Sequence, residues 1–517
     1  MKTASMRRFA ALACVSVFAL SLGACGGGGG GSGSTTTGGG TSGGTGGGTT
    51  GGTGGGTSGG SGGGSGGGTS DVTTLEYFYG QGSATGLYAI DPGVPTSTIT
   101  VTSDVVSDPM GPVPVIAGTL SNATITGEHV ARVVYPDSSG RLWQVTTDPN
   151  VGTPTPERVS SAQVSTTVCS LRVGNDLADT DNVRIAYAVQ TGSDCSSGKD
   201  WKVTRVGDGA SIAPDDFPGA PIVGLVDPAD GGHSGWLTLE GGTVELVAPD
   251  LTVTDLGVSG VKSADYFESL LDGTVFLNID GALYTYQQQT KTLSAVDGFS
   301  FNSGLDPVAA VTDGEDLYFV DARKLYRADP VAGTVSVISD PADSASLGLM
   351  GSERLTVTPN YVVWAYGRDT TPSDGNPFAD VAHVQSINKS SLAKTEGDDV
   401  TMPYGFNQGI FDRTGGWFFY TTTDGSGNVN AVAYKADGSD KKVYQDAQWT
   451  GASLKLGQLG DMGASIEIAY MLSGVTLNQT DLSGVAVKSV TGNAPETTPR
   501  NLGSLPSGVN GFFPFGG

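Results

Sequence analysis

A run of three short strand-like segments recurs along the chain and constrains its fold more than any other feature. In each segment aromatic or β-branched residues alternate with polar ones, and Asp, Gly or Pro follows, as in half-buried strands that end in tight turns. No long stretch has helical periodicity. The chain is therefore expected to be all-β. The clearest copies are residues 274–280, 282–286 and 292–297, then 316–321, 324–329 and 335–340, offset by 42 to 43 residues, with a third at 77–79, 87–92 and 99–104.

Weaker copies bring the total to about nine hairpin units, spaced 39 to 59 residues apart within the 447 residues from 71 to 517. Short strands at such a period are typical of a β-propeller, whose blades bury their faces only against neighbouring blades. At about 55 residues per blade, seven or eight blades are expected. The alternatives are a string of β-sandwiches and a β-solenoid, whose repeats should be shorter and stricter.

One element of the repeat resembles a known blade signature. Leu325 to Pro330 reads Leu-Tyr-x-x-Asp-Pro and precedes a turn with Gly333, and Leu87 to Pro92 has the same form. The pattern resembles the blades of quinoprotein-like and TolB-like propellers. The resemblance covers about a third of the chain and lacks the tryptophan docking motif of the quinoprotein group, so it implies the fold and not membership of either group.

The N-terminus predicts export. Three basic residues precede an apolar run from Phe9 to Leu22 that has the length of a signal peptide and is short for a membrane-spanning helix. Leu22-Gly-Ala-Cys25 resembles the lipobox of bacterial lipoproteins. The resemblance implies removal of residues 1–24, acylation of Cys25 and anchoring in a lipid bilayer. Because Gly26 replaces the Asp of inner-membrane retention signals, the outer membrane of a Gram-negative cell is expected. The alternative is an ordinary secretory signal with a chance cysteine.

Residues 26–70 contain only Gly, Ser and Thr, with 28 glycines in 45 positions. Such a segment has no side chain able to bury apolar area, so residues 25–70 are expected to form a disordered linker. Its root-mean-square reach is about 35–40 Å. Replication slippage, without selection for reach, would produce a similar segment. The expected divisions are a signal peptide at 1–24, the lipidated cysteine and linker at 25–70, and the propeller at 71–517.

The charge balance excludes some partners. The chain has 52 Asp and Glu against 27 Lys and Arg, a net charge of −25. Nucleic acids and anionic lipid surfaces require a surplus of basic residues, so neither is an expected partner. Cationic partners or Ca²⁺ would be attracted. Acidity that serves only the solubility of an exported protein is the alternative.

Two cysteines remain once Cys14 is assigned to the signal peptide and Cys25 to lipid. In an oxidising compartment, Cys169 and Cys195 are expected to form a disulfide. By the chain-entropy model, closing their loop contributes roughly 3.5 kcal/mol.

A search for catalytic motifs finds none. His129, His233 and His383 lie far apart, and His233 is interpreted as a loop residue. The chain lacks HExxH, a serine-hydrolase elbow and a Walker loop in the folded region. Among its many carboxylates, no glycosidase-like pair can be chosen from sequence. No catalytic residue and no cofactor are therefore expected.

One weak calcium candidate remains. Asp424, Ser426, Asn428 and Asn430 place oxygen atoms at alternating positions, without the closing Glu of an EF-hand. A second acidic cluster contains Asp176, Asp179 and Asp181. Hairpin turns require the same residue types, and this is the preferred interpretation.

The C-terminal residues include three phenylalanines flanked by glycine, Phe512, Phe513 and Phe515. This segment is expected to close the last blade by covering an edge strand. A binding tail is the alternative interpretation.

Anchor, linker and missing catalytic motifs together predict a non-enzymatic binding platform in the cell envelope. Its expected partners are envelope proteins, peptides or glycans. The alternatives are an enzyme that acts on envelope polysaccharide or phosphoester through carboxylates in the central channel, and a structural surface protein. Acidic, His or Arg side chains converging in the channel would favour the enzyme, whereas Val, Gly and Thr would argue against it.

Overall fold

The computed structural model describes residues 76–513 with gaps between many strands. The gaps are 81–85, 91–97, 103–112, 117–119, 122–123, 126–130, 137–141, 148–156, 159–167, 175–182, 207–214, 230–231, 271, 303–308, 342–353, 372, 374–378, 402–408, 411–415, 424–428, 445–453, 460–465, 474–481, 492–494 and 506–510.

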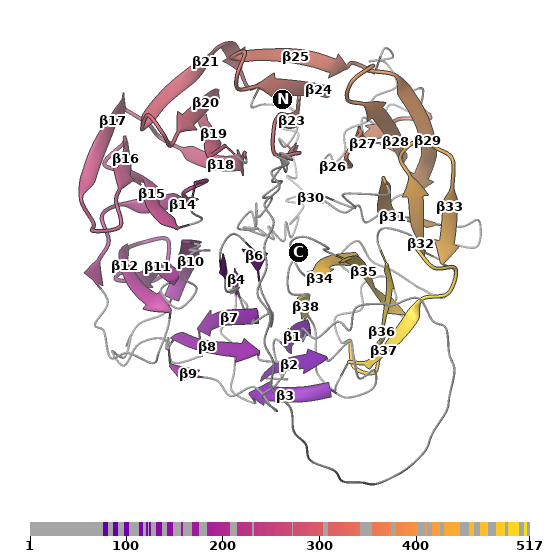
Figure 1. The fold of residues 1–517 in the computed structure, drawn as a ribbon, viewed down its shortest axis with the longest axis horizontal. Helices are drawn as coiled ribbons and strands as arrows, with labels where there is room; N and C mark the ends of the chain where they lie inside the picture. Colours follow the sequence, from indigo (N-terminus) through magenta and orange to yellow (C-terminus); the bar gives the residue numbers. More distant parts are fainter. Residues whose placement is uncertain are drawn as a thin grey trace, which may run out of the picture.

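Nine antiparallel or mixed sheets of three to five strands stand around a common axis and form a ring (Figure 1). In most of them, consecutive strands pair in chain order from the centre outwards. This is the expected all-β propeller. The expected number of seven or eight blades is not confirmed, because the described strands form nine blade-sized sheets. No helix among the described residues has the length and hydropathy to cross a bilayer.

The first of the nine sheets combines the first three described strands with the last one. The strands of the first three blades are β1 (Glu76–Gly80), β2 (Gly86–Ile90), β3 (Thr98–Thr102) and β38 (Gly511–Phe513); then β4 (Val113–Ile116), β7 (Ala131–Pro136), β8 (Leu142–Thr147) and β9 (Glu157–Arg158); then β10 (Val168–Gly174), β11 (Val183–Gln190), β12 (Lys199–Val206) and β13 (Asp215–Asp216). The short pair β5 (Leu120–Ser121) and β6 (Thr124–Ile125) stands apart.

Three regular blades follow. Their strands are β14 (Ala220–Val226), β15 (His233–Glu240), β16 (Thr243–Val247) and β17 (Val253–Ser259); β18 (Ala264–Ser269), β19 (Thr274–Ile279), β20 (Ala282–Gln287) and β21 (Thr292–Ser300); and β22 (Ala309–Thr312), β23 (Leu317–Asp321), β24 (Lys324–Asp329) and β25 (Thr334–Ser339).

The last three blades are less regular, since β30 pairs in parallel with β26 in a five-stranded sheet and the next sheet has three strands. Their strands are β26 (Arg354–Val357), β27 (Tyr361–Arg368), β28 (Val381–Asn388), β29 (Lys394–Thr401) and β30 (Gly409–Ile410); β31 (Trp417–Thr423), β32 (Val429–Lys435) and β33 (Lys441–Tyr444); and β34 (Leu454–Leu459), β35 (Ile466–Ser473), β36 (Ala486–Thr491) and β37 (Arg500–Ser504).

The core lies between blades. On β19, Val275 and Leu277 pack towards the β14–β17 blade, whereas Phe276 packs towards the β22–β25 blade. On β23, Phe319 joins Phe276 while Tyr318 packs with Trp364 of the next blade. Middle strands are thus buried on both faces, not half-buried as their pattern suggested, because every blade is covered by two neighbours.

The sequence repeat has a local explanation. Leu283 and Leu325 occupy the same place in neighbouring blades and are fully buried. Asp329 is the aspartate of the motif that begins at Leu325. Its Oδ1 accepts the backbone N–H groups of Val331 at 2.9 Å and Ala332 at 2.8 Å. Such a turn uses the short carboxylate in place of a backbone acceptor. The Leu-Tyr-x-x-Asp-Pro signature therefore encodes one core position and one capped turn.

In two adjacent blades an aspartate also ties the incoming connection to its blade. Asp280 Oδ1 accepts the backbone N–H groups of Lys262 at 2.9 Å and Ser263 at 2.8 Å. In the next blade the buried carboxylate of Asp321 accepts the N–H of Asn302 at 3.0 Å. The abundance of aspartate in the repeats is thus partly structural.

The C-terminal strand closes the ring on the first blade. Residues Gly511 to Phe513 pair antiparallel with Tyr77 to Tyr79 of β1. The expectation that the C-terminal segment covers an edge strand is correct for Phe512 and Phe513, but the edge belongs to the first blade and not the last. The first and last described strands therefore share one sheet (Figure 1). Phe515 lies outside the described residues.

A disulfide joins Cys169 and Cys195, as expected, with 5.4 Å between their Cα atoms. Cys169 lies on β10, and Cys195 lies in the exposed loop between β11 and β12. The loop has hydrogen bonds of its own, since Asp194 Oδ1 accepts the N–H groups of Ser196 at 2.9 Å and Ser197 at 2.7 Å. The bond fixes this compact loop to the innermost strand of its blade.

Candidate functional site

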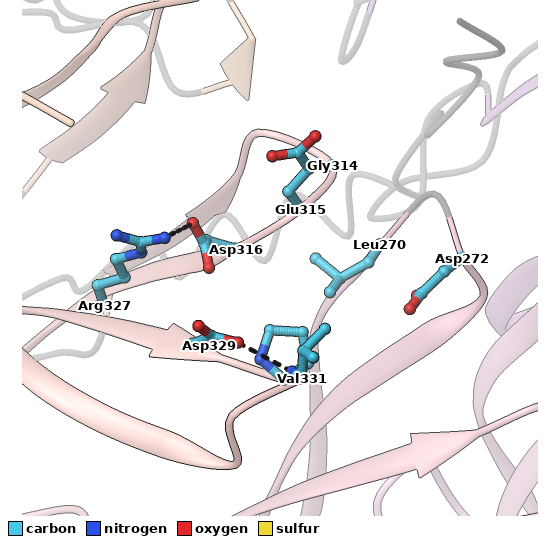
Figure 2. Close-up of a pocket in the computed structure, with 9 residues that line it drawn as sticks. Leu270, Asp272, Gly314, Glu315, Asp316, Arg327, Asp329 and Val331 are labelled. Atoms are coloured by element: carbon cyan, nitrogen blue, oxygen red, sulfur yellow. Dashed lines mark hydrogen bonds and ion pairs between the residues drawn. The ribbon is translucent and has the colours of Figure 1, made fainter. Parts of the chain in front are cut away.

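A cavity of about 420 Å³ opens between the β18–β21 blade and the β22–β25 blade (Figure 2). Three hairpin turns surround it, those between β18 and β19, between β22 and β23, and between β24 and β25. In an antiparallel meander the first and third turns of a blade lie at the same end. The cavity therefore lies on one face of the ring.

Carboxylates dominate the polar lining. They are Asp272 from the first blade and Glu315, Asp316 and Asp329 from the second. Two of these carboxylates stabilise the turns that carry them. Asp272 Oδ1 accepts the N–H of Thr274 at 2.8 Å, and Asp329 Oδ1 accepts the N–H of Val331. An Asp that caps a turn with one oxygen keeps its charge available to a ligand.

Arg327 is the one basic residue that lines the cavity, and it forms an ion pair with Asp316. Arg327 Nη2 lies 2.6 Å from Asp316 Oδ2, and the Asp316 side chain is only 10% exposed. Burial raises the pKa of Asp316 above its usual value; the Arg327 guanidinium opposes this, while the charges of Asp313 and Asp329 add to it. The lining therefore keeps a net negative charge even with this ion pair formed.

Part of the cavity wall is apolar. Leu270 is buried, Pro330 belongs to the β24–β25 turn, and Val331 in that turn is 93% exposed. An aliphatic chain can pack against such a wall while its charged end meets carboxylates, as Lys and Arg side chains do at interfaces. The geometry therefore suits a cationic side chain.

The lining offers carboxylates but no histidine, cysteine or serine. In the part of the chain that the structure describes, no group of three or more His, Cys, Asp or Glu residues is placed to hold a metal ion. Recognition by charge and shape is what this arrangement supports.

Several residues singled out from the sequence lie elsewhere. Cys25 and the calcium candidates Asp424, Ser426 and Asn428 are outside the described residues, as are Asp176, Asp179 and Asp181. Asn430 is 4% exposed and lies on β32. The calcium site and the lipidation of Cys25 stay predictions.

Two of the three histidines are described. His383 is buried on β28, where Nε2 lies 2.6 Å from Glu396 Oε2 and Nδ1 lies 2.6 Å from Asp399 Oδ1. His233 is the first residue of β15, so its interpretation as a loop residue is wrong. Burial and then the nearby charge of Arg184 lower the pKa of His233 to about 3. Its ring packs edge-on against Trp236, with centroids 5.3 Å apart.

The sequences of three innermost strands bear on the alternative that the protein is an enzyme with carboxylates in its central channel. Among the three inner strands β14, β18 and β22, the residues that are charged at neutral pH in ordinary surroundings are Asp265 and Glu268, both on β18. Convergent acids and bases are therefore not found on these three strands. Glu268 is nevertheless unusual, because enclosure of its carboxyl group raises its pKa to about 8.

Replacing Glu268 with Gln is expected to flatten the pH dependence of stability. In the wild type the unfolded chain loses this proton near pH 4.5 and the folded chain near pH 8. Stability therefore falls as pH rises across that window, by up to about 1.4 kcal/mol per pH unit. Urea unfolding at pH 5, 7 and 8.5 would measure it. Equal slopes in Glu268→Gln and wild type would contradict the enclosed carboxyl.

The sequence did not reveal the cavity. In the sequence Asp316 and Asp329 only mark boundaries of the repeat, and no motif distinguishes Asp272, Glu315 or Arg327. A usable signal existed, since the carboxylates occupy first and third turns of adjacent repeats. Choosing them among 52 acidic residues requires knowing which turns share a face.

Comparisons with known proteins find similar folds only among solved structures. No protein-family model and no curated protein sequence matches the chain. A solved structure of the eukaryotic initiation factor is similar at a TM-score of 0.50 and 11% identity, covering 85% of this chain and 98% of that one. TolB from Agrobacterium tumefaciens has 15% identity and a TM-score of 0.28, covering 50% and 87% of the two chains. Oligopeptidase B from Leishmania major has 11% identity and a TM-score of 0.38, covering 72% and 54%.

At such identities these likenesses concern the fold alone. The nine sheets around one axis place the chain in the class of β-propeller proteins. A propeller is compatible with service as a binding platform.

Proposed function

We propose that this protein is an exported, lipid-anchored binding platform of the cell envelope, which captures polypeptides through basic side chains. The cavity between the β18–β21 and β22–β25 blades carries the proposal. Its lining has four carboxylates and one guanidinium, and an ion pair already engages that guanidinium. The net charge of −25 attracts cationic partners from a distance.

The anchor part of the proposal rests on Cys25 and on the Gly, Ser and Thr linker that follows it. Two or three acyl chains on one residue make a durable anchor, where one chain binds reversibly. Cell fractionation of a Cys25→Ala variant tests it. Release of that variant from membranes supports anchoring, whereas equal membrane retention of both proteins contradicts it. Separation of inner and outer membranes tests the outer-membrane assignment.

Neutralising the cavity is expected to weaken partner binding at least tenfold. The variant Asp272→Asn, Glu315→Gln, Asp329→Asn removes three charges, while each Asn keeps the oxygen that caps its turn. Loss of charge–charge attraction reduces both affinity and the salt dependence of association. Cross-linking in intact cells, followed by mass spectrometry, identifies the partners, and titration with a basic peptide measures affinity.

A matched control removes the same charge elsewhere. Asp200, Asp215 and Glu240 are exposed on other blades, and their neutral amide variants leave the cavity intact. The control is expected to bind within twofold of wild type. If both triple variants lose affinity equally, general acidity and not the cavity attracts the partner. If neither loses affinity, the cavity is not the binding site.

A further inference from the structure

The turn between β22 and β23 faces two neighbours at once. On one side, Glu315 and Asp316 line the cavity shared with the β18–β21 blade. On the other side, Asp313 contacts Lys389, which follows β28 in the β26–β30 blade. Lys389 does not line the cavity. One short turn therefore connects the cavity to a blade that does not form it.

Asp313 organises this turn from within. Its Oδ1 accepts the backbone N–H groups of Glu315 at 3.1 Å and of Asp316 at 2.9 Å. Thr312 Oγ1 donates to the carbonyl of Asp316 at 2.9 Å and accepts the N–H of Gly314 at 2.9 Å. The directions of the Glu315 and Asp316 side chains thus depend on where the Asp313 carboxylate is held.

The other oxygen of Asp313 is held from the neighbouring blade. Lys389 Nζ lies 2.9 Å from Asp313 Oδ2, and the two side chains are only 13% and 16% exposed. The Tyr318 hydroxyl donates to the same oxygen at 3.2 Å, and the Lys389 ammonium lies 5.8 Å from the Tyr318 ring centroid. A charge pair this sheltered from water is screened weakly, so its geometry is well defined.

Lys389 is itself presented by an ordered loop. Its backbone N–H donates to the carbonyl of Asn360 at 2.9 Å. Asn388 Oδ1 accepts the N–H groups of Ser390 at 3.1 Å and Ser391 at 2.9 Å. The backbone from which the Lys389 side chain extends to Asp313 is therefore held in place.

Electrostatics make this support necessary. Burial alone would raise the pKa of Asp313, but the Lys389 charge and the turn N–H groups outweigh it and hold the pKa below its usual value. Without Lys389, a largely buried negative charge would stand beside the carboxylates of the cavity. Repulsion and the loss of an anchor would then favour opening of the turn.

We propose that Lys389 is a positioning residue for the cavity, acting through Asp313 to hold the turn that carries Glu315 and Asp316. The inference rests on the proposed function, since it concerns the same cavity. By linkage, a ligand that needs this turn in place also stabilises the Lys389–Asp313 contact between blades.

The decisive experiment is a titration of the folded protein with acetyl-Gly-Arg-Arg-Gly-amide by calorimetry. Lys389→Met is expected to weaken binding at least fivefold. Simple electrostatics predict the opposite sign, because removing a positive charge near the cavity should tighten the binding of a cation. Lys389→Arg keeps the charge and is expected to bind within twofold of wild type.

Lys324→Met supplies the electrostatic baseline. Lys324 pairs with Asp340 at 2.8 Å, lies on the same blade as the cavity turn and does not line the cavity. It is expected to leave affinity unchanged or slightly raised. Asp313→Asn keeps an oxygen for the turn but loses the charge that holds Lys389, and it is expected to weaken binding as Lys389→Met does. A thermal melt of each variant confirms that it is folded. If Lys389→Met does not fold, hydrogen exchange of the wild type with and without the peptide decides the matter.

Hydrogen exchange gives an independent readout. The peptide is expected to slow exchange in residues 312–316 and also in residues 388–393, and the second effect is expected to vanish in Lys389→Met. Wild-type affinity or better in both Lys389→Met and Asp313→Asn would overturn the positioning role and leave the proposed function standing. A peptide that binds equally to wild type and to the cavity triple variant would overturn the proposed function itself.

Discussion

A chain that ends at residue 510, and therefore lacks β38, is expected to lose about 2–4 kcal/mol of unfolding free energy. Three residues of β38 pair with β1, and each backbone hydrogen bond contributes about 0.5–1.5 kcal/mol. The loss also leaves β1 with an open inner edge, since β38 is its neighbour on that side. Urea unfolding should show a lower midpoint, and an open strand edge should increase self-association, which sedimentation measures.

The control for this truncation ends at Phe513 and keeps all of β38. It is expected to unfold like the full chain. A second test keeps the length and replaces Phe512 with Pro, which removes one N–H from the strand and disfavours pairing with Phe78. A truncated chain as stable as the control would show that β38 does not close the ring.

Removal of the disulfide by Cys169→Ala and Cys195→Ala is expected to cost roughly 3.5 kcal/mol, by loop-closure entropy for a 26-residue separation. The cost arises mainly because the unfolded chain gains freedom. It is measured as the difference in unfolding free energy between oxidised wild type and the double variant. Hydrogen exchange should rise most in residues 191–198, the loop that the bond holds.

Reduction of the wild type supplies the comparison for the double variant. If the bond acts as a cross-link, the reduced wild type and the Ala variant should have similar stability. A reduced protein as stable as the oxidised one would show that the bond adds nothing to the fold. Free thiols at both cysteines in protein purified without reductant would show that the disulfide does not form.

Local features of the fold could be predicted from the sequence, and relations between distant parts of the ring could not. Leu325 indicated a core position and Asp329 indicated a turn, because each role depends on only a few neighbouring residues. The Cys169–Cys195 pair followed from counting cysteines. The number of blades did not follow, because repeats that bury residues on both faces vary in spacing and merge with their connections.

The cavity illustrates the same limit. Asp272 and Asp329 belong to different blades, and their separation in the chain says nothing of their common face. The Lys389–Asp313 pair spans 76 positions, and only the packing of blade against blade brings the two side chains together. Side chains at such junctions acquire their roles from the curvature of the whole ring.

The closure of the ring on β1 also has a mechanical consequence. Any pull on the segment that precedes Glu76 enters the folded domain through β1, which is held by β2 on one side and β38 on the other. The sheet that contains both the first and the last described strand therefore bears tension first. In a tethered protein, the short pairing of β1 with β38 would set the force at which the ring opens.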